Sequence, residues 1–274
     1  MTDSDSKVLE NDIKSILINH LRKKGWFNDV HALINEFTVD NSSRRVDLCV
    51  IQKDLSVAFE IKSEADSLAR LDGQVTKYSE YFDKVIVVAS KKHISGILVK
   101  TPINVAVWEV TDRVKIIRRG CIKRRFNISR FIDLMTVVDL RRLVSMHGGF
   151  GANKNRNQLG LEILKIPPST VRTFALNALI SRYILTTNNF WENVGSGLIN
   201  NSHLSSLSMQ KVHSPTCIKN IRGHLNKVLC NDDPHLITLS KNGKIFGEVP
   251  KEISILLQST QSSSESISSI ATEE

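Results

Sequence analysis

The order in which helical and strand-like apolar patterns follow one another along residues 7–110 constrains the fold more than any other feature of the sequence. Apolar residues recur at helical spacing in two segments, and in five others they alternate or run continuously, as in strands. Gly25 ends the first helical pattern, and Ser67 is the predicted N-cap of the second. The helices are predicted over Lys7–Lys24 and Ser67–Phe82, and the strands over His31–Phe37, Arg45–Ile51, Leu55–Ile61, Lys84–Ala89 and Val105–Val110. This order predicts an α/β fold: a helix, a three-stranded meander, a helix and a strand, with a further strand later.

Beyond residue 113 the pattern becomes mainly helical. Helices are predicted over Ser129–Met146 and Ser169–Ile184, with a flexible glycine-rich connection over 147–153. Later residues are polar and weakly periodic, and the Ser-rich, acidic end is typical of disorder. We therefore expect four parts: a core over 1–112, a basic helical region over 113–190, a polar region over 191–257 and a disordered tail over 258–274.

Positive charge is concentrated in the middle of the chain. Residues 1–100 carry 15 Lys and Arg against 15 Asp and Glu, residues 101–185 carry 15 against 5, and residues 186–274 carry 7 against 8, so the middle segment supplies the net charge of +9. Such a block can release counterions from a polyphosphate backbone, which gives affinity that does not depend on base sequence. A solvated helical face explains the same charges, so the block alone does not choose between the two interpretations.

Several classes of protein are disfavoured. The apolar runs are too short to cross a bilayer, and the N-terminus lacks the basic and apolar parts of a signal peptide, so we expect a cytoplasmic protein with no membrane partner. The cysteines are scattered, without a C-x-x-C pair or a histidine at zinc-finger spacing. We therefore expect reduced, structural cysteines and no zinc site at Cys49, Cys121, Cys217 and Cys230.

Two carboxylates and an amine are predicted to converge where two neighbouring strands meet. Asp47 lies in the second strand, and Glu60-Ile61-Lys62 ends the third. Because side chains alternate along a strand, Glu60 and Lys62 share a face, and the neighbouring strand can bring Asp47 beside them. Carboxylates suit Mg²⁺, which would polarise a phosphodiester and activate water while Lys62 orients that water or offsets charge. Taken alone, the pattern D-x(n)-E-x-K is weak, because charged residues at strand ends are commonly solvated.

The second predicted helix adds to this hypothesis. Arg70, Gln74 and Tyr78 are spaced four residues apart and share a helix face beside the buried stripe, so they can face the same site. A half-buried core aromatic with its hydroxyl at the rim explains Tyr78 equally. Asp66 either supports the site by pairing with Arg70 or acts as a helix-capping acid.

Together these motifs resemble the PD-(D/E)XK nuclease superfamily. Asp47, Glu60-Ile61-Lys62 and the order of elements resemble its restriction-endonuclease-like core, and the Q-x-x-x-Y motif of Gln74 and Tyr78 resembles the RecB-like members. Glu60-Ile61-Lys62-Ser63 together with the segment Asp66–Val85 resembles, more closely, a bacterial and phage branch with a helical C-terminal region. The resemblance covers residues 7–110 well and 120–185 loosely.

The resemblance implies a role for each matching residue. Asp47, Glu60 and the carbonyl of Ile61 would hold the metal ion, Lys62 would be the catalytic amine, and Gln74 and Tyr78 would position the phosphate or the water. Glu36 matches the place of an accessory acidic ligand, although a solvated strand-end charge explains it as well. Glu10 is a further candidate, but a surface glutamate is the simpler interpretation. Val46 stands where the superfamily's name has proline, a residue that many members lack.

The densest basic cluster is a candidate nucleic-acid surface. It comprises Arg118, Arg119, Lys123, Arg124 and Arg125, and Arg70 is a further candidate contact. Phe126 beside the cluster is either a stacking platform or a core residue.

The expected function is a Mg²⁺-dependent deoxyribonuclease, with Mn²⁺ as an alternative ion and DNA as the partner. Many superfamily members are dimers, so the resemblance allows a homodimer. Phage defence, restriction, recombination and DNA repair all use this chemistry. One competing hypothesis is a catalytically silent nucleic-acid-binding or regulatory protein that keeps the fold, against which the intact Asp47, Glu60 and Lys62 argue. Another is an interaction module whose basic segment meets an acidic protein or a membrane surface.

Overall fold

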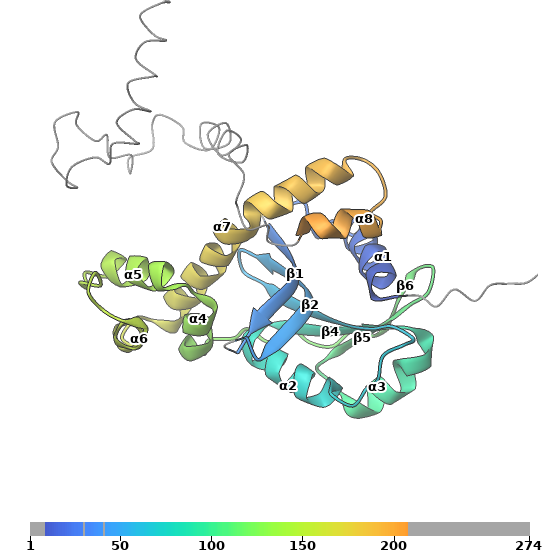
Figure 1. Cartoon of the computed structure of the whole chain (residues 1–274). Coiled ribbons are helices and arrows are strands. Elements are labelled where there is room, and N and C mark those ends of the chain that lie inside the picture. The colour runs from blue at the N-terminus through green and yellow to red at the C-terminus, as the bar shows by residue number, and fades with distance from the viewer. Residues whose placement is uncertain (1–8, 30, 41, 208–274) are drawn as a thin grey trace, which may run out of the picture. The chain divides into compact units, whose positions relative to one another are not determined.

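The computed structural model describes residues 9–29, 31–40 and 42–207, which pack as one compact unit (Figure 1). The described helices are α1 (Glu10–Lys23), α2 (Leu71–Tyr81), α3 (Ile94–Lys100), α4 (Ile128–Leu134), α5 (Val137–Met146), α6 (Arg156–Ile163), α7 (Pro168–Val194) and α8 (Asn201–Leu204), with 3-10 turns at Lys91–His93 and Ser205–Leu207. The strands are β1 (His31–Val39), β2 (Arg44–Gln52), β3 (Ser56–Lys62), β4 (Lys84–Ala89), β5 (Ala106–Val110) and β6 (Val114–Arg118).

The strands form one mixed sheet in the order β1-β2-β3-β4-β5-β6. The meander β1-β2-β3 is antiparallel, β3, β4 and β5 run parallel, and β6 returns antiparallel to β5. Helices separate the parallel strands, as crossovers between parallel strands require. The predicted α/β class and its order of helix, three-stranded meander, helix and strand are confirmed.

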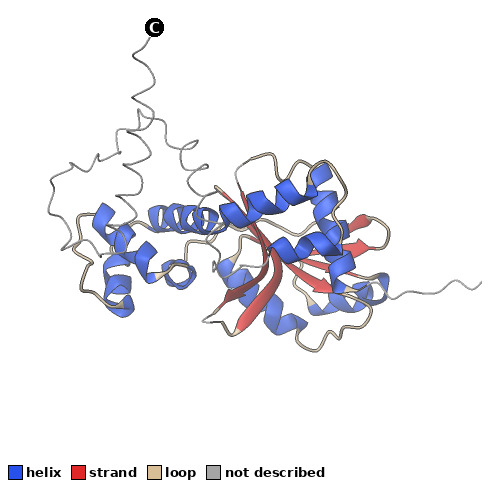
Figure 2. Cartoon of the chain, turned by 45° about the horizontal axis from the view of Figure 1, so that its top comes forward, coloured by secondary structure: helices blue, strands red, loops and turns tan. Residues whose placement is uncertain are grey.

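Helices lie on both faces of the sheet (Figure 2), and an apolar cluster fills each interface. On one face Ile34, Ala58 and Val87 pack with α2, α3 and the helices α4–α7. On the other face Leu33 and Phe59 pack with α1, with the C-terminal part of α7 and with α8. Because neighbouring strand residues point to opposite faces, strands buried on both sides read as the nearly continuous apolar runs seen in the sequence.

The second helix begins later than predicted. The expected N-cap Ser67 is wrong, because α2 starts at Leu71 after Arg70. Asp66 Oδ2 instead accepts hydrogen bonds from the backbone N–H and the hydroxyl of Ser63, at 2.8 and 2.6 Å, which closes a turn between β3 and the helix. This loop places residues 63–70 beside the end of β3.

The helical region differs from its prediction in two places. The helix expected over Ser129–Met146 is two helices, because Thr136 and Asp139 form a capping box that starts α5. A further short helix, α6, follows the connection at 147–153 and was not predicted; Asn155 caps it. The edge strand β6 was also not predicted, since its residues are half-exposed or exposed and carry little apolar signal.

Helix α7 joins the helical region to the sheet. It begins at Pro168, one residue before the predicted start at Ser169, and continues ten residues beyond the predicted end at Ile184, to Val194. Polar Thr and Asn residues weaken its apolar pattern there. Packing compensates: Phe190 is fully buried, and the buried Thr187 hydroxyl accepts a hydrogen bond from Leu33 N–H at 3.0 Å. In the described part of the chain, no helix combines the length and apolarity needed to cross a membrane.

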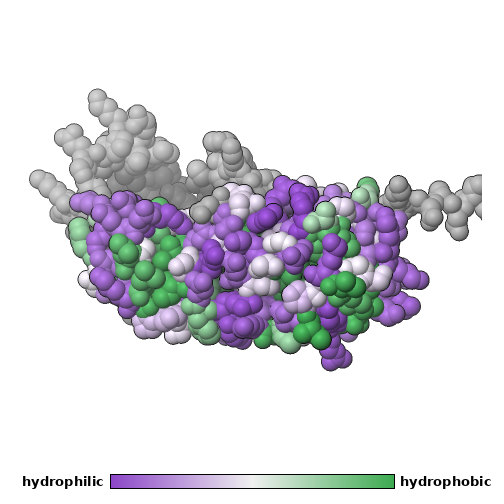
Figure 3. Space-filling model, turned by 90° about the horizontal axis from the view of Figure 1, so that it is seen from below, coloured by the Kyte–Doolittle hydropathy of each residue, from purple (hydrophilic) through white to green (hydrophobic). Residues whose placement is uncertain are grey.

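Seen from below, the surface is mostly hydrophilic, and its apolar patches are separated by polar side chains (Figure 3). Val99 and Ile103 are among the most exposed apolar residues, at 88% and 83%. The strand-like pieces expected at Leu236–Leu239 and Lys244–Val249 and the tail expected at 258–274 lie outside the described residues.

Candidate active site

A polar cavity of about 300 Å³ opens at the C-terminal end of β3. The ladder between β2 and β3 ends at Leu48 and Phe59, and the next positions in the same register are Asp47 and Glu60. The walls of the cavity come from α1, the β1–β2 hairpin, β3, the loop after β3, and α2. The lining residues are Glu10, Ser43, Arg44, Arg45, Asp47, Glu60, Ile61, Lys62, Asp66, Arg70, Gln74 and Tyr78.

Asp47 and Glu60 are neighbouring carboxylates at the cavity, Asp47 half-buried and Glu60 fully buried. Burial, followed by the charge of Glu60, raises the pKa of Asp47 to about 7. Burial also raises the pKa of Glu60, an effect that the neighbouring Lys62 ammonium opposes. Glu60 is 1% exposed, and its Oε2 atom has no hydrogen-bond partner among the described residues. When both are ionised, the pair carries more negative charge than Lys62, the cation in direct contact with it, balances.

Lys62 is the amine that the pattern predicted. It is buried, and its Nζ lies 2.7 Å from Glu60 Oε1 and 3.3 Å from Gln74 Oε1. The alternation of side chains therefore brings Glu60 and Lys62 to the face that α2 covers, as expected. Lys62 neutralises one oxygen of Glu60 and leaves the other free for a further cation.

The backbone of Ile61 turns toward Asp47. Its N–H donates to Asp47 Oδ2 at 2.7 Å, so the carboxylate takes the place of the next ladder partner. In an extended strand the N–H and the C=O of one residue point to the same side. The carbonyl of Ile61 therefore lies on the side of Asp47, which is where the expected metal role would need it.

Gln74 and Tyr78 stand over the carboxylates from α2, but Tyr78 is anchored differently from the expectation. Tyr78 is fully buried, and its hydroxyl donates to the carbonyl oxygen of Arg45 at 2.6 Å. Burial, and after it the charge of Glu60, raises the pKa of Tyr78. Its hydrogen is committed to the backbone of β2, so Tyr78 fixes the hairpin against α2, while the Gln74 amide faces Lys62.

Helix α1 contributes a pair of residues that sequence reasoning undervalued. Glu10 lines the cavity, although a surface glutamate was the simpler interpretation, and its Oε1 lies 2.7 Å from Lys14 Nζ. The Lys14 side chain is 1% exposed, and its charge lowers the pKa of Asp47 while that of Glu10 raises it. Most lysines on a helix face water. The position of Lys14 in the apolar stripe of Ile13 and Leu17 was therefore the sequence signal that this lysine is buried.

The other predicted residues divide into those that line the cavity and those that do not. Arg70 lines it, and so does Asp66, whose carboxylate closes the loop rather than pairing with Arg70. Glu36 lies outside: its side chain is half-exposed and its Oε2 is 3.2 Å from Arg45 Nη1.

The basic cluster at 118–125 also lies outside the lining residues, and two of its arginines hold the structure together. Arg118 Nε donates to the Val105 carbonyl at 2.8 Å, and its guanidinium also contacts Thr101. The backbone N–H of Arg125 donates to Asp83 Oδ1 at 2.9 Å, and its Nε donates to the Phe82 carbonyl at 3.3 Å. Arg119, Lys123 and Arg124 are exposed, as is the neighbouring Phe126, which lies under the Arg172 guanidinium rather than in the core.

Comparison with known proteins shows the family. The model of a family described as bacteriophage P4 protein cII matches residues 3–208. The chain belongs to this family. Protein cII of Enterobacteria phage P4 is 33% identical over 217 residues, which cover 77% of this chain and 81% of that protein. A solved protein of unknown function from Silicibacter pomeroyi is 19% identical and aligns with a TM-score of 0.35 over 52% of this chain and 94% of its own. The name cII states no chemistry, so the activity has to be inferred from the site.

The residues of this cII-family site fit a hard divalent cation. Within the described ranges, His, Cys, Asp and Glu side chains do not form a group of three or more that could hold a metal ion. Mg²⁺ does not require such a group, since it retains several waters and takes one or two carboxylates together with substrate oxygens. Glu60 Oε2, the Asp47 carboxylate and the Ile61 carbonyl, which points to the side of Asp47, supply a suitable oxygen set.

Proposed function

We propose that this chain is a divalent-metal-dependent nuclease that hydrolyses DNA phosphodiester bonds at the cavity beside β3. One observation carries the proposal: the half-buried Asp47 and the buried Glu60 lie beside the buried Lys62, and Glu60 Oε2 has no partner in the part of the chain that the structure describes. Burying a carboxylate oxygen without a partner costs free energy, so such an atom is expected where a ligand completes the site.

The residues of the site divide the work. Asp47, Glu60 and the Ile61 carbonyl would hold Mg²⁺ or Mn²⁺. When bound, the ion supplies the Lewis acidity that polarises a phosphodiester and lowers the pKa of water. Lys62, held between Glu60 and Gln74, donates to the attacking water or to a phosphate oxygen as charge develops. Gln74 keeps the ammonium directed into the cavity.

The order of elements supports a restriction-endonuclease-like core as part of the same proposal. The three antiparallel strands, the helix α2 and the parallel strand β4 follow the order that the superfamily resemblance implies. DNA as the substrate, a homodimer, a cytoplasmic location and a role in phage defence, restriction or repair stay predictions.

Cleavage assays on variants of the site test the proposal. Supercoiled plasmid, linear duplex and single-stranded DNA are incubated with Mg²⁺, with Mn²⁺ or with EDTA. We expect metal-dependent cutting that Glu60→Gln and Lys62→Met each reduce about 10³-fold, equivalent to about 4 kcal/mol. The matched control is Glu64→Gln, an exposed glutamate in the loop after β3, which should cut like the wild type.

The alternative function is binding without turnover. A wild-type protein that binds DNA and leaves every substrate intact with both metals would contradict the nuclease proposal and favour a silent nucleic-acid-binding protein. Equal activity of the Glu60→Gln variant and the wild type would place any cleavage elsewhere.

A further inference from the structure

The turn between β1 and β2 projects beside the cavity in a constrained conformation. Asp40 and Ser42 have positive φ angles of 57° and 69°, in the left-handed region that residues other than glycine rarely adopt. The Ser43 hydroxyl donates to Asp40 Oδ2 at 2.6 Å, and Ser43 N–H donates to the Asp40 carbonyl at 3.0 Å. The hairpin is thus closed by its own polar groups.

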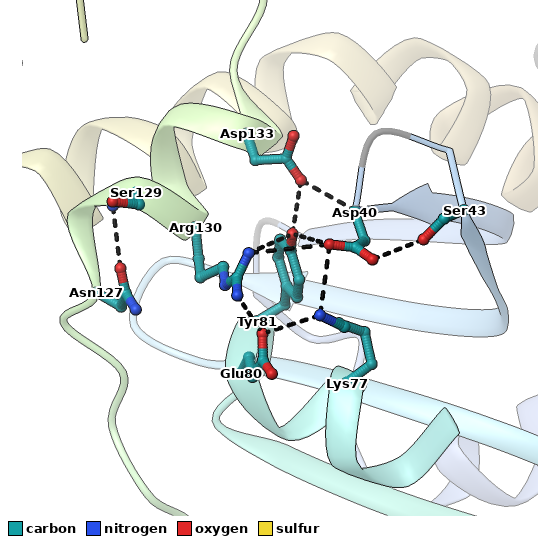
Figure 4. Close-up of polar contacts among 9 residues, drawn as sticks. All are labelled: Asp40, Ser43, Lys77, Glu80, Tyr81, Asn127, Ser129, Arg130 and Asp133. Atoms are coloured by element: carbon teal, nitrogen blue, oxygen red, sulfur yellow. Dashed lines mark hydrogen bonds and ion pairs between the residues drawn. The ribbon is translucent and has the colours of Figure 1, made fainter. Parts of the chain in front are cut away.

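Contacts from α2 and α4 hold this turn from behind (Figure 4). Asp133 Oδ2 accepts from Asp40 N–H at 3.0 Å and from the Tyr81 hydroxyl at 2.7 Å. Lys77 Nζ lies 3.5 Å from Asp40 Oδ1. Arg130 stacks over the Tyr81 ring at 5.2 Å and pairs with Glu80 at 2.5 Å. Helix α4 of the helical region therefore fixes the tip of a hairpin that belongs to the sheet.

The hairpin carries two arginines into the wall of the cavity. Arg44 and Arg45 follow the turn directly, and Arg70 lines the same cavity from the loop before α2. A Cβ added at Gly73 of α2 would come within 3.8 Å of Arg44 Nη2, so the Arg44 guanidinium reaches across to that helix. Tyr78 fixes the Arg45 backbone from below. The backbone that carries Arg45 is therefore held in place, and the three arginines line the cavity from the hairpin and from the loop before α2.

These arginines are available for a ligand. Among the described residues, no carboxylate lies within ion-pair distance of Arg44 or Arg70. Arg45 pairs with Glu36 at 3.2 Å, but both side chains are about half-exposed or more, so exchanging this partner costs little, about 0–1 kcal/mol. In contrast, the Arg118 and Arg125 guanidinium groups of the basic cluster donate to the backbone carbonyls of Val105 and Phe82, at 2.8 and 3.3 Å.

The charges that line the cavity cancel until a cation binds. Glu10, Asp47, Glu60 and Asp66 supply four carboxylates, and Arg44, Arg45, Lys62 and Arg70 supply four cations. A divalent cation would bring the formal sum to +2, so an anion is attracted to the loaded site. Guanidinium groups bind phosphates with bidentate hydrogen bonds, which suits a chain of phosphodiesters that crosses the cavity mouth.

We propose that Arg44, Arg45 and Arg70 form a binding site for the phosphodiester backbone of nucleic acid at the mouth of the cavity, on a hairpin arm that the Asp40–Tyr81–Asp133 network holds in place. The inference rests on the proposed nuclease function and names its substrate-binding residues. Binding at this site does not depend on base sequence, because backbone phosphates carry none.

Equilibrium binding separates this inference from cleavage. Fluorescence anisotropy of a labelled oligonucleotide is measured in Ca²⁺ across a salt series. Arg44→Gln and Arg70→Gln should each weaken binding about tenfold and lower the slope of log K against log salt by about 0.7–0.9, the value of one lost phosphate contact. Arg119→Gln, an exposed arginine of the 118–125 cluster, is the matched control and should leave affinity and slope unchanged. Thermal unfolding checks that each variant is folded.

Two further variants are expected to change the affinity for the oligonucleotide in opposite directions. Glu36→Gln releases Arg45 and should strengthen binding about two- to threefold, since the competing surface pair is weak. If Glu36 held a metal ion instead, the same change would weaken metal-dependent binding. Tyr81→Phe loosens the arm and should weaken binding without changing the salt slope, because the number of phosphate contacts in the complex stays the same.

The outcomes distinguish the two proposals. Wild-type cleavage combined with unchanged affinity and slope in Arg44→Gln and Arg70→Gln would overturn the binding site and leave the nuclease standing. Binding that depends on these arginines without any cleavage would support the site and contradict the nuclease. Loss of binding in Arg119→Gln alone would place the nucleic acid on the basic cluster and overturn the inference, as would a wild-type protein that binds no oligonucleotide.

Discussion

The two ends of β3 bury carboxylates in opposite ways. At the Ser56 end, Asp83 Oδ2 accepts from the N–H and the hydroxyl of Ser56 and from Arg172 Nη2, at 2.9, 3.0 and 2.9 Å, while Oδ1 accepts from Arg125 N–H. At the Lys62 end, Lys62 Nζ pairs with one oxygen of Glu60, and Glu60 Oε2 has no partner among the described residues. At the Ser56 end the charge of the buried carboxylate is balanced by the fold, whereas at the Lys62 end one buried carboxylate oxygen has no partner among the described residues.

The contrast between these two ends shows how a buried carboxylate that stabilises the fold differs from one that indicates a functional site. A buried carboxylate that is matched by a cation and several donors holds elements together, and Asp83 connects β3, β4, the segment after β6 and α7. A buried pair with surplus negative charge destabilises the folded chain until something neutralises it. The second arrangement is therefore a better indicator of a site than burial or charge alone.

The largest effect is expected at the balanced end. Asp83→Asn leaves the Arg172 guanidinium buried without its counter-charge, so the free energy of unfolding should fall by about 3–5 kcal/mol. Urea unfolding followed by tryptophan fluorescence measures it. Asp72→Asn on α2, which changes an exposed acid, should alter stability by less than about 0.5 kcal/mol. If Asp83→Asn lowered stability no more than Asp72→Asn, the charge of Asp83 would not be holding the structure together, and the contrast between the two ends of β3 would fail.

Asp47→Asn should instead raise the free energy of unfolding, by an amount that depends on pH. The pKa of Asp47 is about 7 in the folded chain and 3.8 as its ordinary value, so the folded state binds the extra proton and the wild type loses stability as pH rises from about 4 to 7. The asparagine cannot ionise, so the free energy of unfolding of the variant should match that of the wild type near pH 4. At pH 8 it should be higher by roughly 1–4 kcal/mol.

Thermal unfolding at several pH values, without metal, measures this difference. A variant that is less stable than the wild type at pH 8 would show that Asp47 is balanced like Asp83.

The smallest effect is the stabilisation by metal. Mg²⁺ at ten times its dissociation constant should raise the free energy of unfolding by about 1.4 kcal/mol at pH 8. The gain should shrink below pH 7, because Asp47 must lose its proton to hold the ion. Glu60→Gln should abolish the gain while Asp72→Asn retains it, and calorimetry with and without EDTA compares them. An equal gain in Glu60→Gln would place the ion elsewhere.

The unbalanced end could be predicted from sequence because it depends on local rules. Alternation along β3 places Glu60 and Lys62 on one face, and a short turn sets the register that brings Asp47 opposite. The anchoring of the site depends instead on contacts between distant segments. Asp40 meets Asp133 across 93 positions, and Arg172 reaches Asp83 across 89, which no periodicity reveals. Lys14 is different, because its partner Glu10 lies four residues earlier on the same helix and its place among apolar residues can be read from the sequence.

Helix α7 has a consequence for how this protein can be divided. Its first half packs among the helices α4–α6, and its last turns lie with α1 in the apolar layer on the other face of the sheet. A fragment that ends near residue 112 would uncover Leu33 and Phe59 and lose the Thr187 partner of β1. The sheet and the helical region are thus expected to unfold in one cooperative transition, and gene rearrangements would have to transfer them together.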